Sequence, residues 1–206
     1  MPNLVPDLIA PGTLSGVPQP VLTAGPGLLL RPWTAADAPM IVDAFRDPAT
    51  RHWHCRSVES VAEAEELIDG FTRGWRTETS ATWAVVTAGG EVLGRVALRA
   101  IGTAKGEAEV AYWMRAAARG RGAAPAGVGA MSAWAFGVGL HRLILNHSTR
   151  NEASCRVAQK TGFELEGVRR SAELHVDGWH DVHLHALIGP SDQREDDPLG
   201  PYRAAG

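Results

Sequence analysis

The spacing of hydrophobic and polar positions changes repeatedly between residues 27 and 188, and it predicts a domain that mixes helices and strands. Short apolar runs rich in β-branched residues are typical of strands. They occur at 27–33, 82–88, 91–102, 107–114, 141–148, 163–170 and 181–188. Apolar positions three and four residues apart are typical of helices. They occur at 34–48, 57–75, about 122–138 and 151–162.

Capping and turn residues support these boundaries. Thr34 has the side chain expected of a helix N-cap, and Gly162 suits the end of the helix that precedes it. The tripeptide at 88–90, Ala-Gly-Gly, predicts a tight hairpin turn between two strands. The three central strands are therefore expected to form an antiparallel meander.

The two ends of the chain differ in composition from this domain. Residues 1–26 contain repeated Pro and Gly, which predicts an extended arm that packs on the surface at most and builds no regular core. Residues 189–206 are polar and rich in turn formers, which predicts a flexible tail. The functional domain is therefore expected to occupy residues 27–188.

Bulk composition limits the class of protein. A chain of 206 residues with 45% hydrophobic positions is expected to form one globular domain. A net charge of -3 argues against nucleic-acid binding. The sequence has no apolar run long enough to span a membrane and no basic secretory leader. Cys55 and Cys155 form no CxxC pair, which favours a reducing compartment, so we expect a cytoplasmic protein.

The segment RGRGAAPAG at 119–127 is the clearest candidate for chemistry. It follows a predicted strand and enters a predicted helix, where Gly120 and Gly122 let the backbone approach a ligand. Free N–H groups and the helix dipole favour an anion there, and Arg119 and Arg121 add positive charge. Neither the ending of a P-loop nor the setting of a dinucleotide fold is present. On these residues alone, the segment is either a phosphate-binding loop or a flexible helix entry with solvated arginines.

Several ordered segments resemble the GCN5-related N-acetyltransferase (GNAT) superfamily. Its pyrophosphate loop, Q/R-x-x-G-x-G/A, matches Arg119, Gly122 and Ala124. The chain resembles the RimJ/RimL-type branch most, over roughly residues 27–188. The segments that carry this resemblance are LLLRPWTAADA, VAYWM, GLHRLILNHSTRNEASCRVAQKTGFELEG and GWHDVHLHALI.

The resemblance implies an α/β (α+β) acyltransferase fold, with a mixed, mostly antiparallel sheet flanked by helices. Acetyl-coenzyme A would lie in a V-shaped opening between the strands at 106–115 and 141–147. The residues implied in pyrophosphate binding are Arg119, Gly120, Arg121, Gly122, Ala123 and Ala124. Pro125 stands where the family usually has threonine, which removes one amide donor, so weaker cofactor binding is expected.

The resemblance also assigns residues to the acetyl-carrying arm of the cofactor. The backbone at Trp113 and Met114 would pair with this arm and polarise the thioester carbonyl, as an oxyanion hole does. Their side chains are equally suited to the core. Asn151 would touch the cofactor arm, and it is also an ordinary N-cap residue for the helix at 151–162.

Two residues are implied in catalysis by the same resemblance. Ser154 would donate a proton or a hydrogen bond to the departing coenzyme A thiolate. Glu173 lies where RimL-type enzymes have a glutamate proposed as the general base, 19 residues after the serine. The plain alternatives are a surface serine and a solvated glutamate. Trp53 and Trp75 either form an aromatic wall on the acceptor side or simply pack.

Histidines are numerous in the second half of the chain. The candidates are His175, His180, His183 and His185 in the C-terminal strands, and His52 and His54 on either side of Trp53. They follow neither HExxH nor a Cys/His spacing typical of zinc sites. The sequence therefore predicts no metal site, and the family that it resembles needs no metal.

Together these features predict an acetyl-coenzyme A-dependent N-acetyltransferase that acts by direct transfer in a ternary complex. The acceptor is a primary amine, either a protein N-terminus or a small molecule. The alternative is a non-catalytic acyl-coenzyme A-binding module that senses its ligand or pairs with a partner. A homodimer is expected from the resemblance only.

Overall fold

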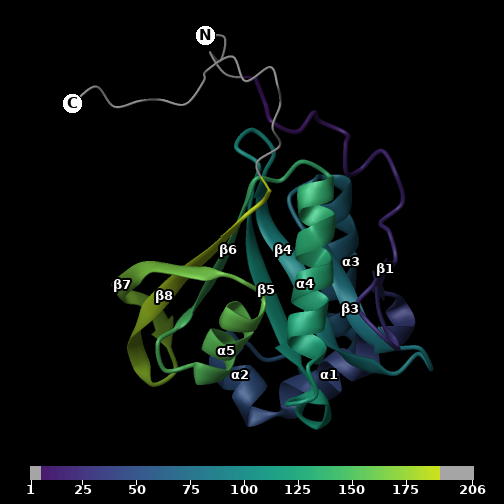
Figure 1. Cartoon of the computed structure of the whole chain (residues 1–206). Helices are drawn as coiled ribbons and strands as arrows, with labels where there is room; N and C mark the ends of the chain where they lie inside the picture. Colours follow the sequence, from purple (N-terminus) through teal and green to yellow (C-terminus); the bar gives the residue numbers. More distant parts are fainter. Residues whose placement is uncertain (1–5, 191–206) are drawn as a thin grey trace.

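One eight-stranded sheet organises the chain, in the order β1-β2-β3-β4-β5-β6-β8-β7 (Figure 1). A computed structural model describes residues 6–190, so residues 191–206 of the predicted tail lie outside the described part. Neighbouring strands are antiparallel, except that β5 and β6 run parallel. The predicted α/β class with a mixed, mostly antiparallel sheet is confirmed.

The elements follow the order that the sequence predicts. The strands are β1 Leu22–Thr23, β2 Leu28–Pro32, β3 Ala81–Thr87, β4 Val92–Gly102, β5 Glu107–Met114, β6 Arg142–Ser148, β7 Glu164–His175 and β8 Gly178–Ile188. The helices are α1 Ala38–Arg46, α2 Pro48–His54, α3 Val61–Arg76, α4 Ala123–Gly137 and α5 Glu152–Lys160, with short 3-10 turns at Ala35–Asp37 and Ala116–Ala118.

Helix α2 and the short strand β1, which lies in the predicted N-terminal arm and pairs with β2, are the elements that the sequence patterns missed. Asp47 leaves the helical conformation after α1, and its carboxylate accepts a hydrogen bond from the Thr50 amide. Pro48 then occupies the first turn of α2, where its missing N–H has no cost. The predicted helix at 34–48 is therefore shorter than expected, because an N-cap and a proline begin a new helix.

Two hydrophobic cores lie on opposite faces of the sheet because side chains alternate along each strand. On β3, Trp83 and Val85 belong to one core, which α4 covers. Ala84 and Val86 of the same strand belong to the other core, which α1 and α3 cover. Strand β3 is consequently buried along almost its whole length.

The parallel strands β5 and β6 separate soon after they start. Their pairing is confined to three residue pairs, from Glu107 with Arg142 to Glu109 with Ile144. Beyond Glu109, β5 continues to Met114 with only its β4 side paired. The edge of β5 that faces away from β4 is thereby left open toward α4 and α5. This is the V-shaped opening that the resemblance implies.

The N-terminal segment contributes to the core that α4 covers, which its composition did not indicate. Leu14 and Ile9 are 1% and 3% exposed. The Glu78 carboxylate accepts hydrogen bonds from the backbone amides of Gly12, Leu14 and Ser15. Polar anchoring and apolar burial together hold this segment against the domain.

We expect Leu14→Ala to lower the free energy of unfolding by about 2–5 kcal/mol, because it leaves a cavity in the core. Val17→Ala is the matched control. Val17 is 56% exposed in the same segment, so its truncation should change stability by less than about 0.5 kcal/mol. Urea unfolding of both variants measures the difference. Equal stability would show that the segment does not pack on the domain in solution.

Candidate active site

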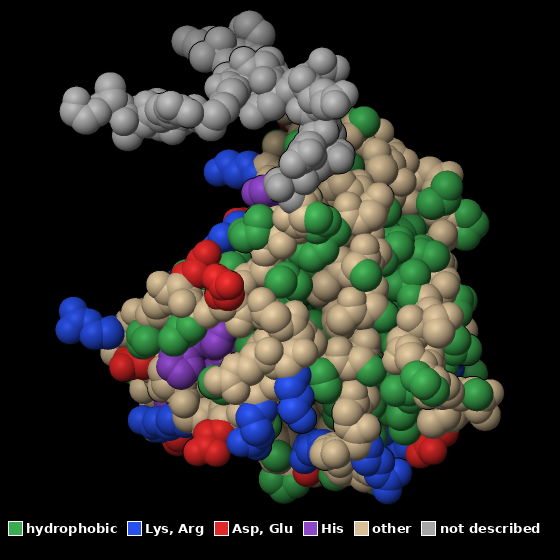
Figure 2. Space-filling view, in the orientation of Figure 1, with side chains coloured by type: hydrophobic (Ala, Val, Ile, Leu, Met, Phe, Trp, Pro, Cys, Tyr) green, Lys and Arg blue, Asp and Glu red, His purple; other side chains and the backbone are tan. Residues whose placement is uncertain are grey.

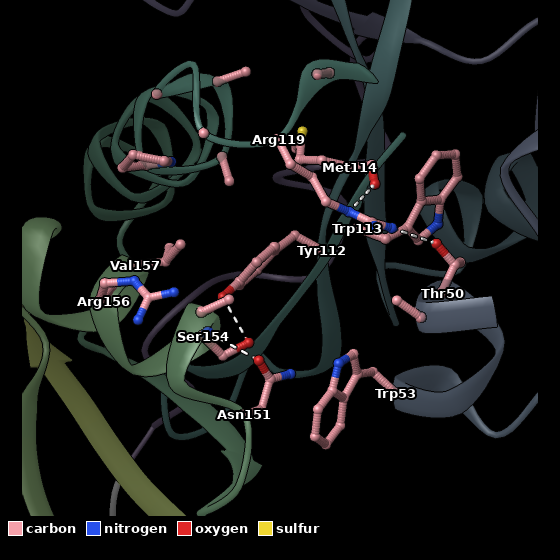
Figure 3. A pocket seen from close by; sticks show the side chains of 18 of the residues that line it. Thr50, Trp53, Tyr112, Trp113, Met114, Arg119, Asn151, Ser154, Arg156 and Val157 are labelled. Carbon is pink, nitrogen blue, oxygen red and sulfur yellow. Dashed lines mark hydrogen bonds between the residues drawn. The ribbon is translucent and has the colours of Figure 1, made fainter. Parts of the chain in front are cut away.

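A cleft opens where β5 and β6 separate, and it has two halves that share lining residues. Figure 3 shows the side chains around the larger half. One half, of about 520 Å³, lies between the end of β5, the loop before α4, and helices α2 and α5. The other half, of about 340 Å³, lies between β4, β5, β6 and the end of β7. Five residues line both halves and so mark their junction: Trp53, His54, Tyr112, Asn151 and Ser154.

The glycine-rich loop forms the wall of the larger half. Gly120 and Gly122 have φ angles of 75° and 80°, a region that residues with a side chain rarely adopt. Gly122 is the N-cap of α4, so Ala123 and Ala124 provide N–H groups that no helical carbonyl accepts. Pro125, which also lines this half, provides none. The loop is built to receive an anion at the N-terminus of a 15-residue helix.

Positive side chains accompany this loop. Arg156 and Lys160 of α5 line the same half of the cleft. Figure 2 shows Lys and Arg side chains gathered around the lower ends of α4 and α5 in that view. Their charge favours a ligand with several negative groups, as a pyrophosphate has.

Arg119 fastens the loop to α2 and is not a free charge. Its guanidinium donates hydrogen bonds to the Asp47 carboxylate and, at 2.9 Å, to the Thr50 hydroxyl (Figure 3). Its Nε donates to the Met114 carbonyl at 3.1 Å. The hydrogen bond from Arg119 holds the pKa of Asp47 below its usual value. Arg121 is exposed and does not line the cleft within the described residues.

The last residues of β5 have side chains in the core and also line the cleft. The side chains of Trp113 and Met114 are 5% and 7% exposed and belong to the two cores. Their backbone continues β5 past the point where β6 has left it. Burial of the side chains therefore fixes the strand while its open edge faces the cleft.

Tyr112 is the central residue of the site that sequence reasoning missed. Its hydroxyl donates a hydrogen bond of 3.0 Å to the Ser154 hydroxyl (Figure 3). Burial raises the pKa of Tyr112 to about 12, so the phenol keeps its proton at neutral pH. Asn151 accepts a hydrogen bond from the Ser154 amide at 3.1 Å, which makes it the N-cap of α5. The segment VAYWM contained this tyrosine, but only the fold brings it to Ser154.

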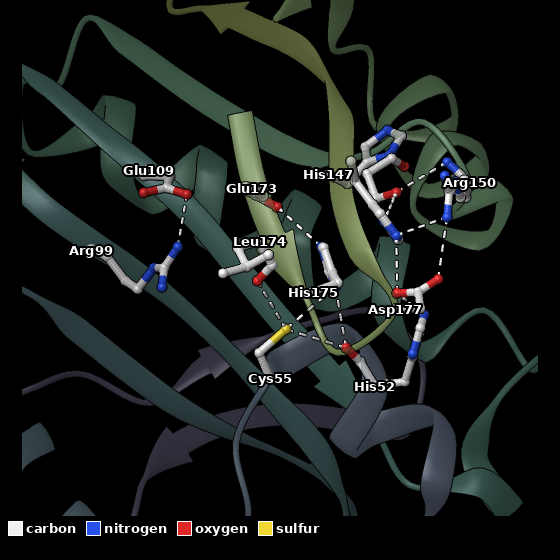
Figure 4. Close-up of polar contacts among 12 residues, drawn as sticks. His52, Cys55, Arg99, Glu109, His147, Arg150, Glu173, Leu174, His175 and Asp177 are labelled. Carbon is white, nitrogen blue, oxygen red and sulfur yellow. Dashed lines mark hydrogen bonds and ion pairs between the residues drawn. The ribbon is translucent and has the colours of Figure 1, made fainter. Parts of the chain in front are cut away.

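Glu173 reaches the smaller half of the cleft from β7, next to an irregular stretch of that strand (Figure 4). The pairing register between β7 and β8 shifts between Arg169 and Glu173, and Ser171 takes a positive φ of 46°. Such bulges commonly redirect side chains beside functional sites. Glu173 lies 3.5 Å from the His175 ring nitrogen, and Ser154 lines the same half.

The two tryptophans proposed for the acceptor side have different positions. Trp53 lies at the junction of the two halves. Trp75 is not among the described residues that line the cleft, which favours the packing alternative over the acceptor wall. It is 7% exposed, packs against Trp83 and Trp134, and donates a hydrogen bond to the Val17 carbonyl. A large ring at the end of α3 fills the core.

His54 is a second residue of the junction with a changed acidity. Burial and the nearby charges of Arg95 and Arg99 lower the pKa of His54 to about 4. Its imidazole is therefore neutral at physiological pH. It lines the cleft between the cofactor loop and Glu173 without adding charge.

A glycine-rich anion site at a helix N-terminus, an open strand edge and a carboxylate beyond it are the parts of an acyl-coenzyme A-dependent transferase. The sequence matches the family described as "Acetyltransferase (GNAT) domain" over residues 27–164. The chain therefore belongs to the GNAT family, and it is an acetyl-coenzyme A-dependent N-acetyltransferase.

Three similar proteins illustrate this membership. An uncharacterized N-acetyltransferase, YoaA of Bacillus subtilis, is 26% identical over 80% of this chain and 95% of its own length. The ribosomal-protein-serine acetyltransferase of Escherichia coli is 30% identical over 48% of this chain and 55% of its own. A solved structure of RimL, a ribosomal L7/L12 α-N-protein acetyltransferase in complex with coenzyme A, superposes with a TM-score of 0.75 at 22% identity, covering 84% and 100% of the two chains.

Membrane-spanning helices have a characteristic length and apolar composition. Within residues 6–190, no helix has both the length and the apolar composition that crossing a membrane requires.

We expect Gly122→Ala to weaken acetyl-coenzyme A binding by about 10-fold, because a left-handed residue with a side chain costs about 1–2 kcal/mol. Gly129→Ala is the control on the same helix. Gly129 has open space at its Cβ position, and this change should leave binding intact and stabilise α4 by up to about 1 kcal/mol. Calorimetric titration with coenzyme A checks both. Equal affinities would remove the loop from the cofactor site.

Proposed function

We propose that the acceptor is the free α-amine of a polypeptide, and that Glu173 removes its proton through a water molecule. Ser154 then donates a hydrogen bond to the departing coenzyme A thiolate, and Tyr112 supplies a proton to it through the Ser154 hydroxyl. The observation that carries this proposal is that Ser154 lines both halves of the cleft, with Tyr112 bound to it and Glu173 in the acceptor half.

The acidity of the acceptor favours an α-amine. An amine must lose its proton before it attacks the thioester. At pH 7 this costs about 1.4 kcal/mol for an α-amine with a pKa of about 8, and about 4.6 kcal/mol for a lysine side chain. One carboxylate that acts through water suits the smaller cost. Two of the similar proteins are named as acetyltransferases of ribosomal proteins, which supports a polypeptide acceptor.

The proton donor and the proton acceptor of the proposed reaction lie in different parts of the cleft. Tyr112 keeps its proton at neutral pH, so it can supply one to the thiolate through the Ser154 hydroxyl. Glu173 lies in the other half, where the amine would enter. After Glu173 has taken the first proton, the neutral amine nitrogen would form its bond to the acetyl carbon while the carbon–sulfur bond breaks. The second proton of the nitrogen would then leave to water, and water would restore the proton that Tyr112 supplies through Ser154 to the thiolate. Base and acid are thereby separated by the reacting thioester.

Charges in the acceptor half favour a polypeptide with acidic residues near its N-terminus. Arg99 is paired with Glu109 at 2.7 Å. Arg95 also lines this half, and its enclosed Nε has no hydrogen-bond partner among the described residues. Burial lowers the pKa of Arg95 only to about 10, so it stays positive at neutral pH. This charge would attract an acidic peptide and repel polycationic amines.

We expect Glu173→Gln to lower kcat/KM for the peptide about 100-fold, because the base is lost, while acetyl-coenzyme A binding stays unchanged. Glu164→Gln is the control, an exposed glutamate at the start of the same strand. Release of coenzyme A thiol measures turnover. Equal rates in the two variants would exclude Glu173 as the base.

Tyr112→Phe should lower kcat about 10-fold or more by removing the donor to Ser154.

Peptide preference tests the acceptor. Peptides that begin with Ser-Ala and continue with Glu-Glu should have a kcat/KM about 10-fold above those that continue with Lys-Lys, and above spermidine or an aminoglycoside. Arg95→Gln should abolish the preference for Glu-Glu, whereas Arg73→Gln, an exposed site on α3, should keep it. Faster turnover of the polyamine or aminoglycoside would overturn the polypeptide assignment.

A further inference from the structure

Three histidines and one cysteine from distant parts of the sequence meet between the sheet and α5. His147 of β6 and His183 of β8 are register partners, so their side chains share one face of the sheet. His185 lies two residues further along β8 on the same face. Cys155 comes from α5, which packs over these strands. One potential metal-ligating atom from each of the four lies within 4.8 Å of all the others.

The ring nitrogens of this cluster lack the partners that buried polar groups normally have. The Nδ1 atom of His147 lies 2.8 Å from the Ser148 carbonyl, which only accepts, so Nδ1 carries the proton and Nε2 the lone pair. Among the described residues, the buried Nε2 of His147 and Nδ1 of His183 have no hydrogen-bond partner. Neither ring nitrogen of His185 makes a hydrogen bond of good geometry, although the Phe163 backbone lies near one of them. Unpartnered buried polar atoms are unfavourable unless a ligand satisfies them.

Burial separates this cluster from the other histidines. His147 and His185 are 6% and 2% exposed. By contrast, the equally buried His180 has partners at both nitrogens, from Ser148 at 2.8 Å and Asp177 at 3.0 Å. His180 is a satisfied structural residue, whereas the cluster under α5 is not.

We propose that His147, His183, His185 and Cys155 bind one Zn²⁺ ion in a tetrahedral site. Three imidazoles and a thiolate are a ligand set that zinc prefers, and four protein ligands make a closed, structural site. In such a site the ligand atoms are about 3.4–3.7 Å apart. The present atoms lie within 4.8 Å of one another, so binding would require them to move closer together. Binding would release the Cys155 thiol proton to solvent.

The position of the site defines what the ion would do. It would tie α5 to β6 and β8, and α5 is the helix whose first turns present Asn151 and Ser154 to the cleft. Cys155 directly follows Ser154, but it does not line either half of the cleft within the described residues. His147 does line the smaller half. Four protein ligands would nevertheless leave no open position on the ion, so we assign it a structural role. The proposal is independent of the acceptor.

Access from solvent is compatible with reversible loading. His183 and Cys155 are partly exposed. Figure 2 shows histidine side chains at the surface between α5 and the β7–β8 hairpin. An ion can reach the cluster there without opening the cofactor half of the cleft.

Titration of the metal-free, reduced full chain with Co²⁺ tests the proposal. We expect one Co²⁺ per chain, with the strong visible absorption of tetrahedral cobalt and a thiolate-to-cobalt band in the near ultraviolet. Zn²⁺ should displace Co²⁺ stoichiometrically with a dissociation constant below about 1 μM. Saturating Zn²⁺ should also raise the Tm by about 5 °C or more, since the ion binds the folded state.

Substitutions separate this site from adventitious binding. Cys155→Ser should abolish the near-ultraviolet band, and His185→Gln should abolish tight binding and the Tm increase. Cys55→Ser and His141→Gln, at an exposed thiol and an exposed histidine, should change neither. Weak octahedral cobalt absorption, or tetrahedral absorption that survives both cluster substitutions, would overturn the proposal. Circular dichroism of each variant verifies that it folds.

Discussion

The early separation of β5 from β6 is the constraint on which the whole site depends. Pairing stops at Glu109, so the backbone up to Met114 keeps an open edge inside the protein. An open strand edge is normally a liability, because its polar groups need partners. Here the side chains of Trp113 and Met114 anchor the strand in both cores while its edge faces the cleft. The fold thus provides backbone donors and acceptors that β6 leaves unpaired along the wall of the cleft, where the family resemblance implies that the cofactor arm binds.

Helices α2 and α5 and the loop before α4 complete the site around this edge, and each depends on local contacts. Asp47 caps α2 and also pairs with Arg119, so one carboxylate joins α2 to the glycine-rich loop. Asn151 caps α5 and thereby places Ser154 beside Tyr112. Capping residues therefore serve as connections between elements that are distant in sequence. The energetic effect of each contact is small, and their combined geometry sets the cleft.

The periodic elements and the loop could be predicted from the sequence, because strand and helix periods and glycine positions are local signals. What depends on contacts between distant residues could not be predicted. Trp75 faces the core rather than the cleft, since Trp83 and Trp134 surround it. Tyr112 could not be singled out from the sequence, because its hydrogen-bond partner Ser154 is on α5, far away in the chain. The histidines of β8 had no zinc spacing, because their partners, His147 and Cys155, come from other elements.

The bulge in β7 makes chain length, and not only residue identity, a determinant of where the proposed base Glu173 lies. Between Arg169 and Glu173 the strand has four steps where β8 has two, from Val182 to His180. Strand β7 therefore has two extra residues in this stretch, and an even number of extra residues keeps Glu173 on the same face of the sheet as its partner His180. Deleting one residue in this stretch would make the surplus odd and turn the carboxylate to the opposite face, because strand side chains alternate. A chain of this fold with a one-residue insertion or deletion here would therefore keep the glutamate in its sequence but turn its carboxylate away from the cleft.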